Sequence, residues 1–226
     1  MRRTERAEQI FARLARANPS PKGELDHVNP YTLLVAVVLS AQATDKGVNR
    51  ATAGLFRQVT NPQQMLDLGE AGLIEHIKSI GLFRAKAKNI IKLSQDLIDH
   101  HGGEVPRTRE ELEKLPGVGR KTANVVLNMA FGVPTMAVDT HVFRVSQRLG
   151  LAKGKTPLAI EEQLLKAVPE TFMQHAHHWL ILHGRYTCLA RGPKCGECTL
   201  EDLCTFKGKT KPASPTAGKP AKRKLK

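Results

Sequence analysis

Apolar and polar residues alternate along this chain with the period of amphipathic helices, and residues that start or stop helices separate the segments. Ile10, Leu14 and Ala17 share one face of the first predicted helix. Thr4 can cap the start of this helix, and the Asn-Pro-Ser-Pro sequence at residues 18–21 ends it. The opening segment is therefore predicted to form one amphipathic helix.

The second segment, residues 33–39, is apolar on nearly every side, which is typical of a buried helix. Asn29 and Pro30 predict its start, because Asn is a good cap and Pro suits the first helical turn. The valines in this segment would also suit a strand, but the cap signal and the length favour a helix. The Asn-Pro pair recurs at Asn61. Further helices are expected to be punctuated by Gly69, Gly81, Gly102 and Gly103.

Two helices joined by a glycine-rich turn form the most distinctive local pattern. Thr108 has a Glu three residues later, the capping-box spacing, and opens a helix that runs to about Lys114. A second helix is predicted from Arg120 to Phe131. The Pro-Gly-Val-Gly turn at residues 116–119 exposes N–H groups at a helix start, where an anion such as a phosphate is attracted. An ordinary connector between helices also uses glycine, so the turn by itself leaves both interpretations open.

The composition agrees with a helical fold. Leu and Ala are abundant, whereas the 226 residues include one Trp, two Tyr and seven Phe. No convincing β-hairpin signal is present. We therefore expect an all-α protein, long enough for one large domain or two small ones.

The charge points to a polyanionic partner. The formal net charge is +14, and eight bases lie after residue 206 with no acid among them, so that the rest of the chain still carries +6. Nucleic acid is the first candidate, although a membrane surface or solubility would explain the charge equally well. Residues 208–226 are rich in Lys, Pro, Ser, Thr and Gly and are predicted to be a disordered basic tail.

No segment suits a membrane span or an export signal. The longest apolar run, residues 33–39, has seven residues, whereas a membrane helix needs roughly 20. The charged N-terminus has no apolar segment behind it. We expect a cytoplasmic protein in a reducing compartment, with no membrane association.

Four cysteines lie near the C-terminus with the spacing Cys188-x6-Cys195-x2-Cys198-x5-Cys204, and no other cysteine occurs. Four thiolates in one short segment can converge on a metal centre, and soft thiolates select zinc or an iron–sulfur cluster. Buried structural cysteines or a disulfide framework are the alternatives, and a reducing compartment disfavours the second.

Lys121 and Asp139 are candidates for catalysis. Lys121 lies in the first turn of a helix, where the helix dipole and partial burial would favour the neutral, nucleophilic amine. A lysine without such a context is usually a solvated surface charge. Asp139 precedes a helical stretch at residues 142–149 and is a natural N-cap. A carboxylate beside an amine can also take its proton, or stabilise positive charge on a sugar ring.

Taken in order, these motifs resemble the endonuclease III family, the bifunctional DNA glycosylases and abasic-site lyases of the helix-hairpin-helix superfamily. The resemblance spans about residues 4–206. It is carried by the cysteine segment and by residues 40–45, 80–82, 115–124 and 138–144.

The resemblance implies two helical domains that flank a DNA-binding cleft. One would be a six-helix barrel of residues 23–133 with a helix-hairpin-helix at about 108–131. The other would combine residues 1–22 with 134–207. It would carry a [4Fe–4S] cluster on the four cysteines in a C-terminal loop, which decides against zinc.

The implied activity is base-excision repair of oxidised pyrimidines in damaged double-stranded DNA by a nucleoid-associated monomer. Lys121 would attack the sugar as the base departs, with Asp139 assisting, and the resulting Schiff base would permit β-elimination. Gln42 and Leu82 would fill the gap left by the extruded nucleotide, supported by Ile80. The remaining candidates for contacts with the DNA backbone are Gly117, Val118, Gly119, His141, Arg144 and, in or near the cysteine segment, Arg185, Arg191 and Lys194.

Two alternative functions remain. An adenine glycosylase would share the hairpin and the cluster, but such relatives lack the lysine nucleophile, carry an acid where this chain aligns Val37, and have a further C-terminal recognition domain. A non-catalytic hairpin module that binds DNA and uses zinc as a structural staple would not need Lys121 and Asp139 together.

Overall fold

The computed structural model describes residues 1–210, and within this range it contains ten α-helices, two short 3-10 helices and no strand. The α-helices are α1 (Arg3–Ala17), α2 (Pro30–Leu39), α3 (Asp45–Leu55), α4 (Pro62–Ile77), α5 (Phe83–His101), α6 (Arg109–Leu112), α7 (Arg120–Phe131), α8 (Thr140–Arg148), α9 (Pro157–Ala167) and α10 (Glu170–Tyr186). The 3-10 helices are η1 (Cys195–Glu197) and η2 (Glu201–Leu203). The predicted all-α class is confirmed. Most of the predicted disordered tail, from residue 211 onward, lies outside the described residues.

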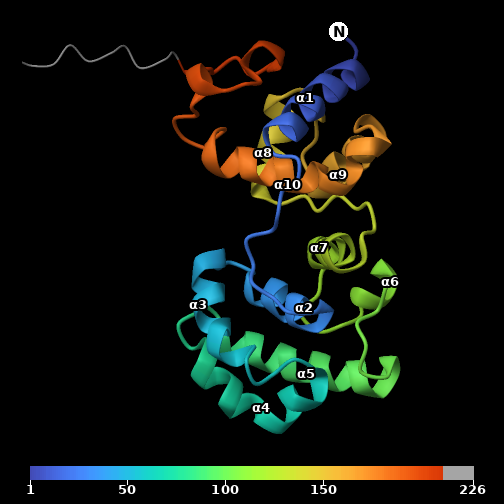
Figure 1. The fold of residues 1–226 in the computed structure, drawn as a ribbon, viewed down its shortest axis with the longest axis vertical. Coiled ribbons are helices and arrows are strands. Elements are labelled where there is room, and N and C mark those ends of the chain that lie inside the picture. Colours follow the sequence, from blue (N-terminus) through green and yellow to red (C-terminus); the bar gives the residue numbers. More distant parts are fainter. Residues whose placement is uncertain (211–226) are drawn as a thin grey trace, which may run out of the picture.

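The helices form two lobes (Figure 1), and one lobe is built around α2. Every residue from Tyr31 to Leu39 is buried, so α2 is the central helix that its continuous apolar sequence predicted, and the strand alternative is wrong. Asn29 caps it, since its side chain accepts a hydrogen bond from the N–H of Thr32 at 2.9 Å. Helices α3 to α7 pack around it.

The other lobe joins the two ends of the described chain. Helices α1, α8, α9 and α10 and the cysteine segment share a second cluster of buried side chains. Phe11, Phe172 and Trp179 lie with their ring centroids 6.2 Å apart in each pair, and the indole N–H of Trp179 donates to the carbonyl of Asn18 at 2.8 Å. The exact domain boundaries at residues 23 and 133 stay predictions.

Several local predictions need correction. Helix α1 begins at Arg3 with Arg2 as its N-cap, not at Thr4, because the carboxylate of Glu5 accepts the N–H of Arg2 at 3.0 Å. Gly69 lies within the bounds of α4 but has a non-helical φ of 72°, so it separates two helical stretches across a kink, in agreement with its predicted role. Helix α6 stops at Leu112, because the chain turns into the hairpin there.

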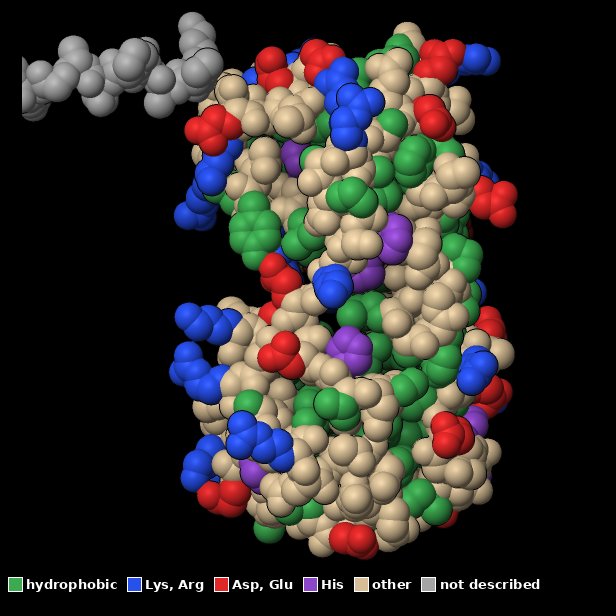
Figure 2. All heavy atoms as spheres, viewed as in Figure 1, with side chains coloured by type: hydrophobic (Ala, Val, Ile, Leu, Met, Phe, Trp, Pro, Cys, Tyr) green, Lys and Arg blue, Asp and Glu red, His purple; other side chains and the backbone are tan. Residues whose placement is uncertain are grey.

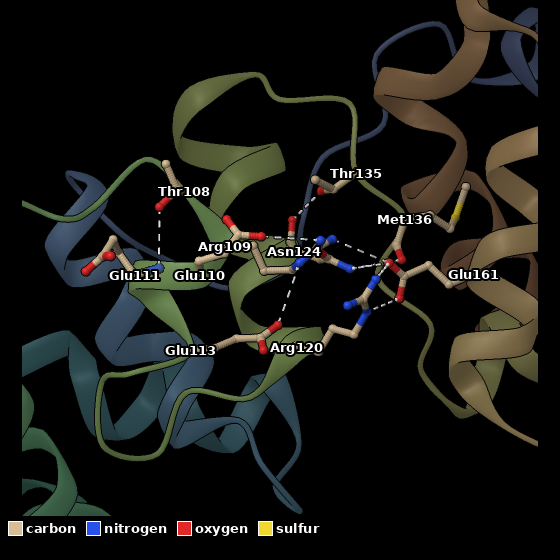
Figure 3. A network of polar contacts seen from close by, with 10 residues as sticks. All are labelled: Thr108, Arg109, Glu110, Glu111, Glu113, Arg120, Asn124, Thr135, Met136 and Glu161. Atoms are coloured by element: carbon tan, nitrogen blue, oxygen red, sulfur yellow. Dashed lines mark hydrogen bonds and ion pairs between the residues drawn. The ribbon is translucent and has the colours of Figure 1, made fainter.

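A buried carboxylate ties the two lobes together (Figure 3). Glu161 of α9 has a side chain only 5% exposed and accepts two hydrogen bonds from Arg120, at 2.8 and 2.9 Å. It also accepts from Asn124 at 3.2 Å and lies 3.9 Å from Arg109. Since Arg120 and Asn124 belong to α7, this contact fixes the hairpin helix against the other lobe.

None of the helices within residues 1–210 combines the length and the apolar character that crossing a membrane requires.

Replacing Glu161 by alanine should destabilise the protein. Removal of one partner from a buried ion pair costs about 3–5 kcal/mol, and the 39% exposure of the Arg120 side chain reduces this cost, so we expect a loss of about 2 kcal/mol. Urea denaturation followed by circular dichroism measures the change. Glu162→Ala, at the neighbouring exposed position, is the control and should have no measurable effect. Equal midpoints for the two variants would contradict the assignment.

Candidate active site and cysteine loop

Lys121 and Asp139 line the same cleft between the lobes. This cleft has a volume of about 570 Å³, and its wall also includes Ser40, His141 and Arg185. Figure 2 shows a notch at the junction of the two lobes, with Lys and Arg side chains gathered along the edge of the lobe below it. Lys121 is exposed, which corrects the expectation of partial burial. Its amine is therefore accessible to a bound chain.

Asp139 is the N-cap of α8, as its position predicted. Its Oδ1 accepts hydrogen bonds from the N–H groups of His141 and Val142, both at 2.8 Å. Both bonds use the same oxygen, which leaves Oδ2 for the cleft that Asp139 lines. The helix start thus fixes the orientation of the carboxylate and partly compensates its charge.

The turn between α6 and α7 presents backbone to solvent. Gly117 and Gly119 are exposed, whereas Val118 is 6% exposed and anchors the turn in the core. Gly117 has φ of +79°, and a Cβ there would lie 3.1 Å from Nδ2 of Asn89, so glycine is required. No side chain caps the start of α7 at Gly119. The geometry suits an anion, and the predicted phosphate contact stays a prediction.

Gln42 and Leu82 share an unusual backbone conformation. Within residues 1–210 they are the non-glycine residues with positive φ, at 54° and 60°. Both are exposed, and Leu82 exposes 61% of its surface although it is apolar. Ile80, in contrast, is 4% exposed and packs in the core beneath Leu82's turn. Strained backbone and an exposed leucine point to a functional constraint at these two positions.

Two arginines that the sequence predicted to contact DNA form hydrogen bonds and ion pairs within the protein. Arg144 donates to the carbonyls of Cys188 at 3.1 Å and Gly184 at 2.8 Å, and Nη2 lies 3.2 Å from His141. Arg185 forms ion pairs with Glu24 and Asp45 of the other lobe. Sequence patterns did not reveal these partners, because they come together only through the fold. Nη1 of Arg144 also donates to the carbonyl of Thr140 at 3.4 Å, which leaves its second N–H for a phosphate.

A smaller inner cavity adjoins Lys121 and Asp139. It has a volume of about 80 Å³, and its wall includes Val37, His177 and His178. Sequence patterns did not place the two histidines among the candidate site residues. The sequence did contain one signal for these site residues: the two histidines are adjacent and lie among apolar residues of α10 that are buried. Burial lowers the pKa of His177 to about 3 and also lowers the pKa of His178.

The four cysteines line one small hollow of about 20 Å³ in the C-terminal loop. Among the described residues, no three His, Cys, Asp or Glu side chains are arranged to hold a single metal ion. Four thiols that line one hollow without converging on a single ion fit a [4Fe–4S] cluster, in which each cysteine binds its own iron, better than a single zinc ion. Burial raises the pKa of the Cys198 and Cys204 thiols.

Arginines of α8 and α1 hold this loop in place. Arg148 donates to the carbonyls of Leu189 at 2.7 Å and Ala190 at 3.1 Å. Arg13 donates to the carbonyl of Thr199 at 2.8 Å and pairs with Asp202. The loop therefore presents its thiols from a backbone that is fixed by contacts to α1 and α8.

Comparison with known proteins gives consistent matches. Residues 35–170 match the family model described as HhH-GPD superfamily base excision DNA repair protein. The chain is 60% identical to endonuclease III of Haemophilus influenzae and 56% identical to that of Escherichia coli K12, over 92% of this chain and 99% of each relative.

Solved structures agree. A trapped endonuclease III–DNA covalent intermediate is 48% identical, with a TM-score of 0.84 over 91% of this chain and 97% of that one. A non-covalent endonuclease III–DNA complex has the same identity and a TM-score of 0.85, covering 91% of this chain and 96% of that one.

Replacing Cys198 by serine should remove the cluster and loosen its loop. The iron of such a cluster prefers thiolate ligands, so a serine oxygen is a poor substitute. Binding of the metal also stabilises the folded conformation of the segment that holds it. We expect iron and sulfide contents to fall to background, and amide exchange to accelerate in residues 188–204. The amides of α2 should stay protected and serve as the internal control. A full iron content in this variant would contradict the ligand assignment.

Proposed function

The chain belongs to the HhH-GPD superfamily of base excision DNA repair proteins and, within it, to the endonuclease III family, and on this premise we propose a role for each residue of its cleft. It is a DNA glycosylase and abasic-site lyase of base-excision repair. The observation that carries the residue assignment is that Lys121 and Asp139, on different helices, line one cleft between the lobes.

Lys121 is the proposed nucleophile. Its neutral Nζ attacks C1′ of the damaged nucleotide, while the glycosidic bond breaks and the base leaves as an anion with the bonding electrons and takes a proton from water. Asp139 stabilises the positive charge that develops on the sugar and then accepts the proton that the amine loses. This proton passes from Asp139 to O4′ as the sugar ring opens, which leaves a protonated Schiff base between C1′ and Nζ. Loss of a C2′ proton then expels the 3′ phosphate and cuts the strand, and water finally releases the lysine.

The substrate class is an oxidised pyrimidine in double-stranded DNA, bound by a monomer at the bacterial nucleoid in the cytoplasm. The glycosidic bond is inaccessible inside the duplex, so the nucleotide must be turned out of the stack. Gln42 and Leu82 enter the gap, and buried Ile80 supports Leu82. Their exposure and positive φ support this role, since strained backbone is kept where it positions a functional side chain.

Contacts to phosphate come from the hairpin. The N–H groups of Gly117, Val118 and Gly119 bind the backbone near the extruded nucleotide, supported by the free start of α7. His141 faces the cleft and contributes at its rim. Arg144 mainly fixes α8 to the cysteine loop and offers only one N–H of Nη1 to DNA.

The cysteine loop holds the cofactor. Cys188, Cys195, Cys198 and Cys204 are the proposed ligands of the [4Fe–4S] cluster, which, when bound, cross-links and orders this loop. The adenine glycosylase alternative is disfavoured, because Lys121 is present and the apolar Val37 lines the inner cavity where that class carries an acid.

Lys121→Ala should abolish the covalent intermediate. Borohydride reduction on a duplex with one thymine glycol traps an adduct only if an amine has formed a Schiff base. We expect an adduct with the unaltered protein and none with Lys121→Ala. The matched control is Lys114→Ala, an exposed lysine of the hairpin that pairs with Glu111, and it should trap normally. Trapping at the normal rate by Lys121→Ala would refute the nucleophile assignment.

Asp139→Asn should separate catalysis from capping. Asparagine caps helices as well as aspartate, so the free energy of unfolding should change by less than about 0.5 kcal/mol. Loss of the carboxylate should lower the single-turnover rate of base excision about 100-fold or more. Asp139→Ala is the comparison, and it should lose about 1 kcal/mol of stability as well as activity. Normal excision by Asp139→Asn would rule out the proposed role.

A further inference from the structure

The wall of the inner cavity contains two adjacent histidines for which the catalytic mechanism has no use. His177 and His178 lie on α10 and are 2% and 8% exposed. Their ring centroids are 5.2 Å apart in an edge-to-face arrangement. Both rings line the cavity that Lys121 and Asp139 also line. The pair is therefore built into the wall of a cavity that shares its catalytic residues with the larger cleft.

Each ring has a polar atom without a partner. The Nδ1 atoms of His177 and His178 are buried and make no hydrogen bond within the described chain. Leaving a buried polar atom unpaired is unfavourable, and two such atoms in one wall suggest that a ligand supplies the missing partners.

The two histidines offer neutral hydrogen-bonding groups to a ligand in this cavity. Because burial lowers the pKa of both histidines, their rings are neutral, and each offers one donor and one acceptor. Val37, Val125 and Met129 supply apolar surface in the same cavity, whose lining also includes charged residues, among them Lys121, Asp139 and Arg185. A pyrimidine base presents carbonyl and N–H groups along one edge, which suit the two neutral rings, and an apolar part that suits the apolar side chains.

We propose that His177 and His178 are specificity-determining residues that hydrogen-bond the polar edge of the extruded pyrimidine base. This inference rests on the proposed function, because it places the base beside Lys121 at the moment of attack. It has one sharp consequence. The two histidines act only while a base is attached, so they matter for base excision and not for β-elimination at a site that has already lost its base.

The test compares two substrates with one set of variants. One duplex carries a thymine glycol, and the same duplex carries a preformed abasic site at that position. Single-turnover rates are measured for His177→Ala and His178→Ala. We expect base excision to fall about tenfold or more, while β-elimination at the abasic site stays within about twofold of the unaltered protein.

Matched variants distinguish a role of the histidines in recognising the base from a role in packing. His175→Ala changes a histidine of the same helix that lies outside the inner cavity, and it should leave the ratio of the two rates unchanged. His178→Gln keeps a donor and an acceptor and should recover most of the excision lost in His178→Ala. Equal losses on both substrates would show a packing role and overturn the proposal, as would unchanged excision.

The same experiment keeps this inference apart from the assignment of the nucleophile. If Lys121 is not the nucleophile, Lys121→Ala retains β-elimination and the trapped adduct, whatever the histidine variants do. If the histidines do not read the base, the two rates stay in their normal ratio while Lys121→Ala is inactive on both substrates.

Discussion

The site depends on one constraint: its two catalytic groups belong to different helices, and the lobes must hold those helices in a fixed relation. Lys121 lies at the start of α7, and Asp139 lies at the start of α8. Ionic contacts secure the seam on both sides of the cleft. Glu161 binds Arg120, the residue before the lysine, and Arg185 binds acids of the facing lobe. A shift of either contact would move the nucleophile relative to the carboxylate.

Helix α7 contacts both lobes, and the buried side-chain amides of Asn124 and Asn128 form hydrogen bonds beyond the helix. Asn124 donates to the carbonyl of Met136 at 3.3 Å and accepts from Thr135 at its own carbonyl. Asn128 donates to the carbonyls of Val133 and Gln174, at 3.3 and 3.2 Å. The bonds to Val133, Thr135 and Met136 satisfy polar groups of the segment between α7 and α8, whose own backbone forms no helical hydrogen bonds. The polar strip that continues from the lysine is therefore the side of α7 that receives the second lobe.

Much of this could be predicted from local sequence. Asn-Pro starts, the continuous apolar run of α2 and the Asp139 cap depend on neighbours within one helical turn, so the order of residues alone is sufficient to predict them. Gly117 could be assigned to the turn, but its contact with Asn89 could not. The partners of Arg144 and Arg185, the exposure of Lys121 and the unpaired histidines arise from segments far apart in the chain. No periodicity encodes such contacts.

Acidic residues in or near a cleft that binds a polyanion need compensation, and the four acids here receive it from three sources. Asp139 is compensated by the N–H groups at the start of α8, Glu24 and Asp45 by Arg185, and Glu161 by Arg120. The cleft can thus keep a carboxylate for chemistry on the sugar without repelling the phosphates. The deeper wall is different, because its histidines are neutral. These rings add hydrogen-bonding groups that an uncharged base can use, beside the charged residues that line the same inner cavity.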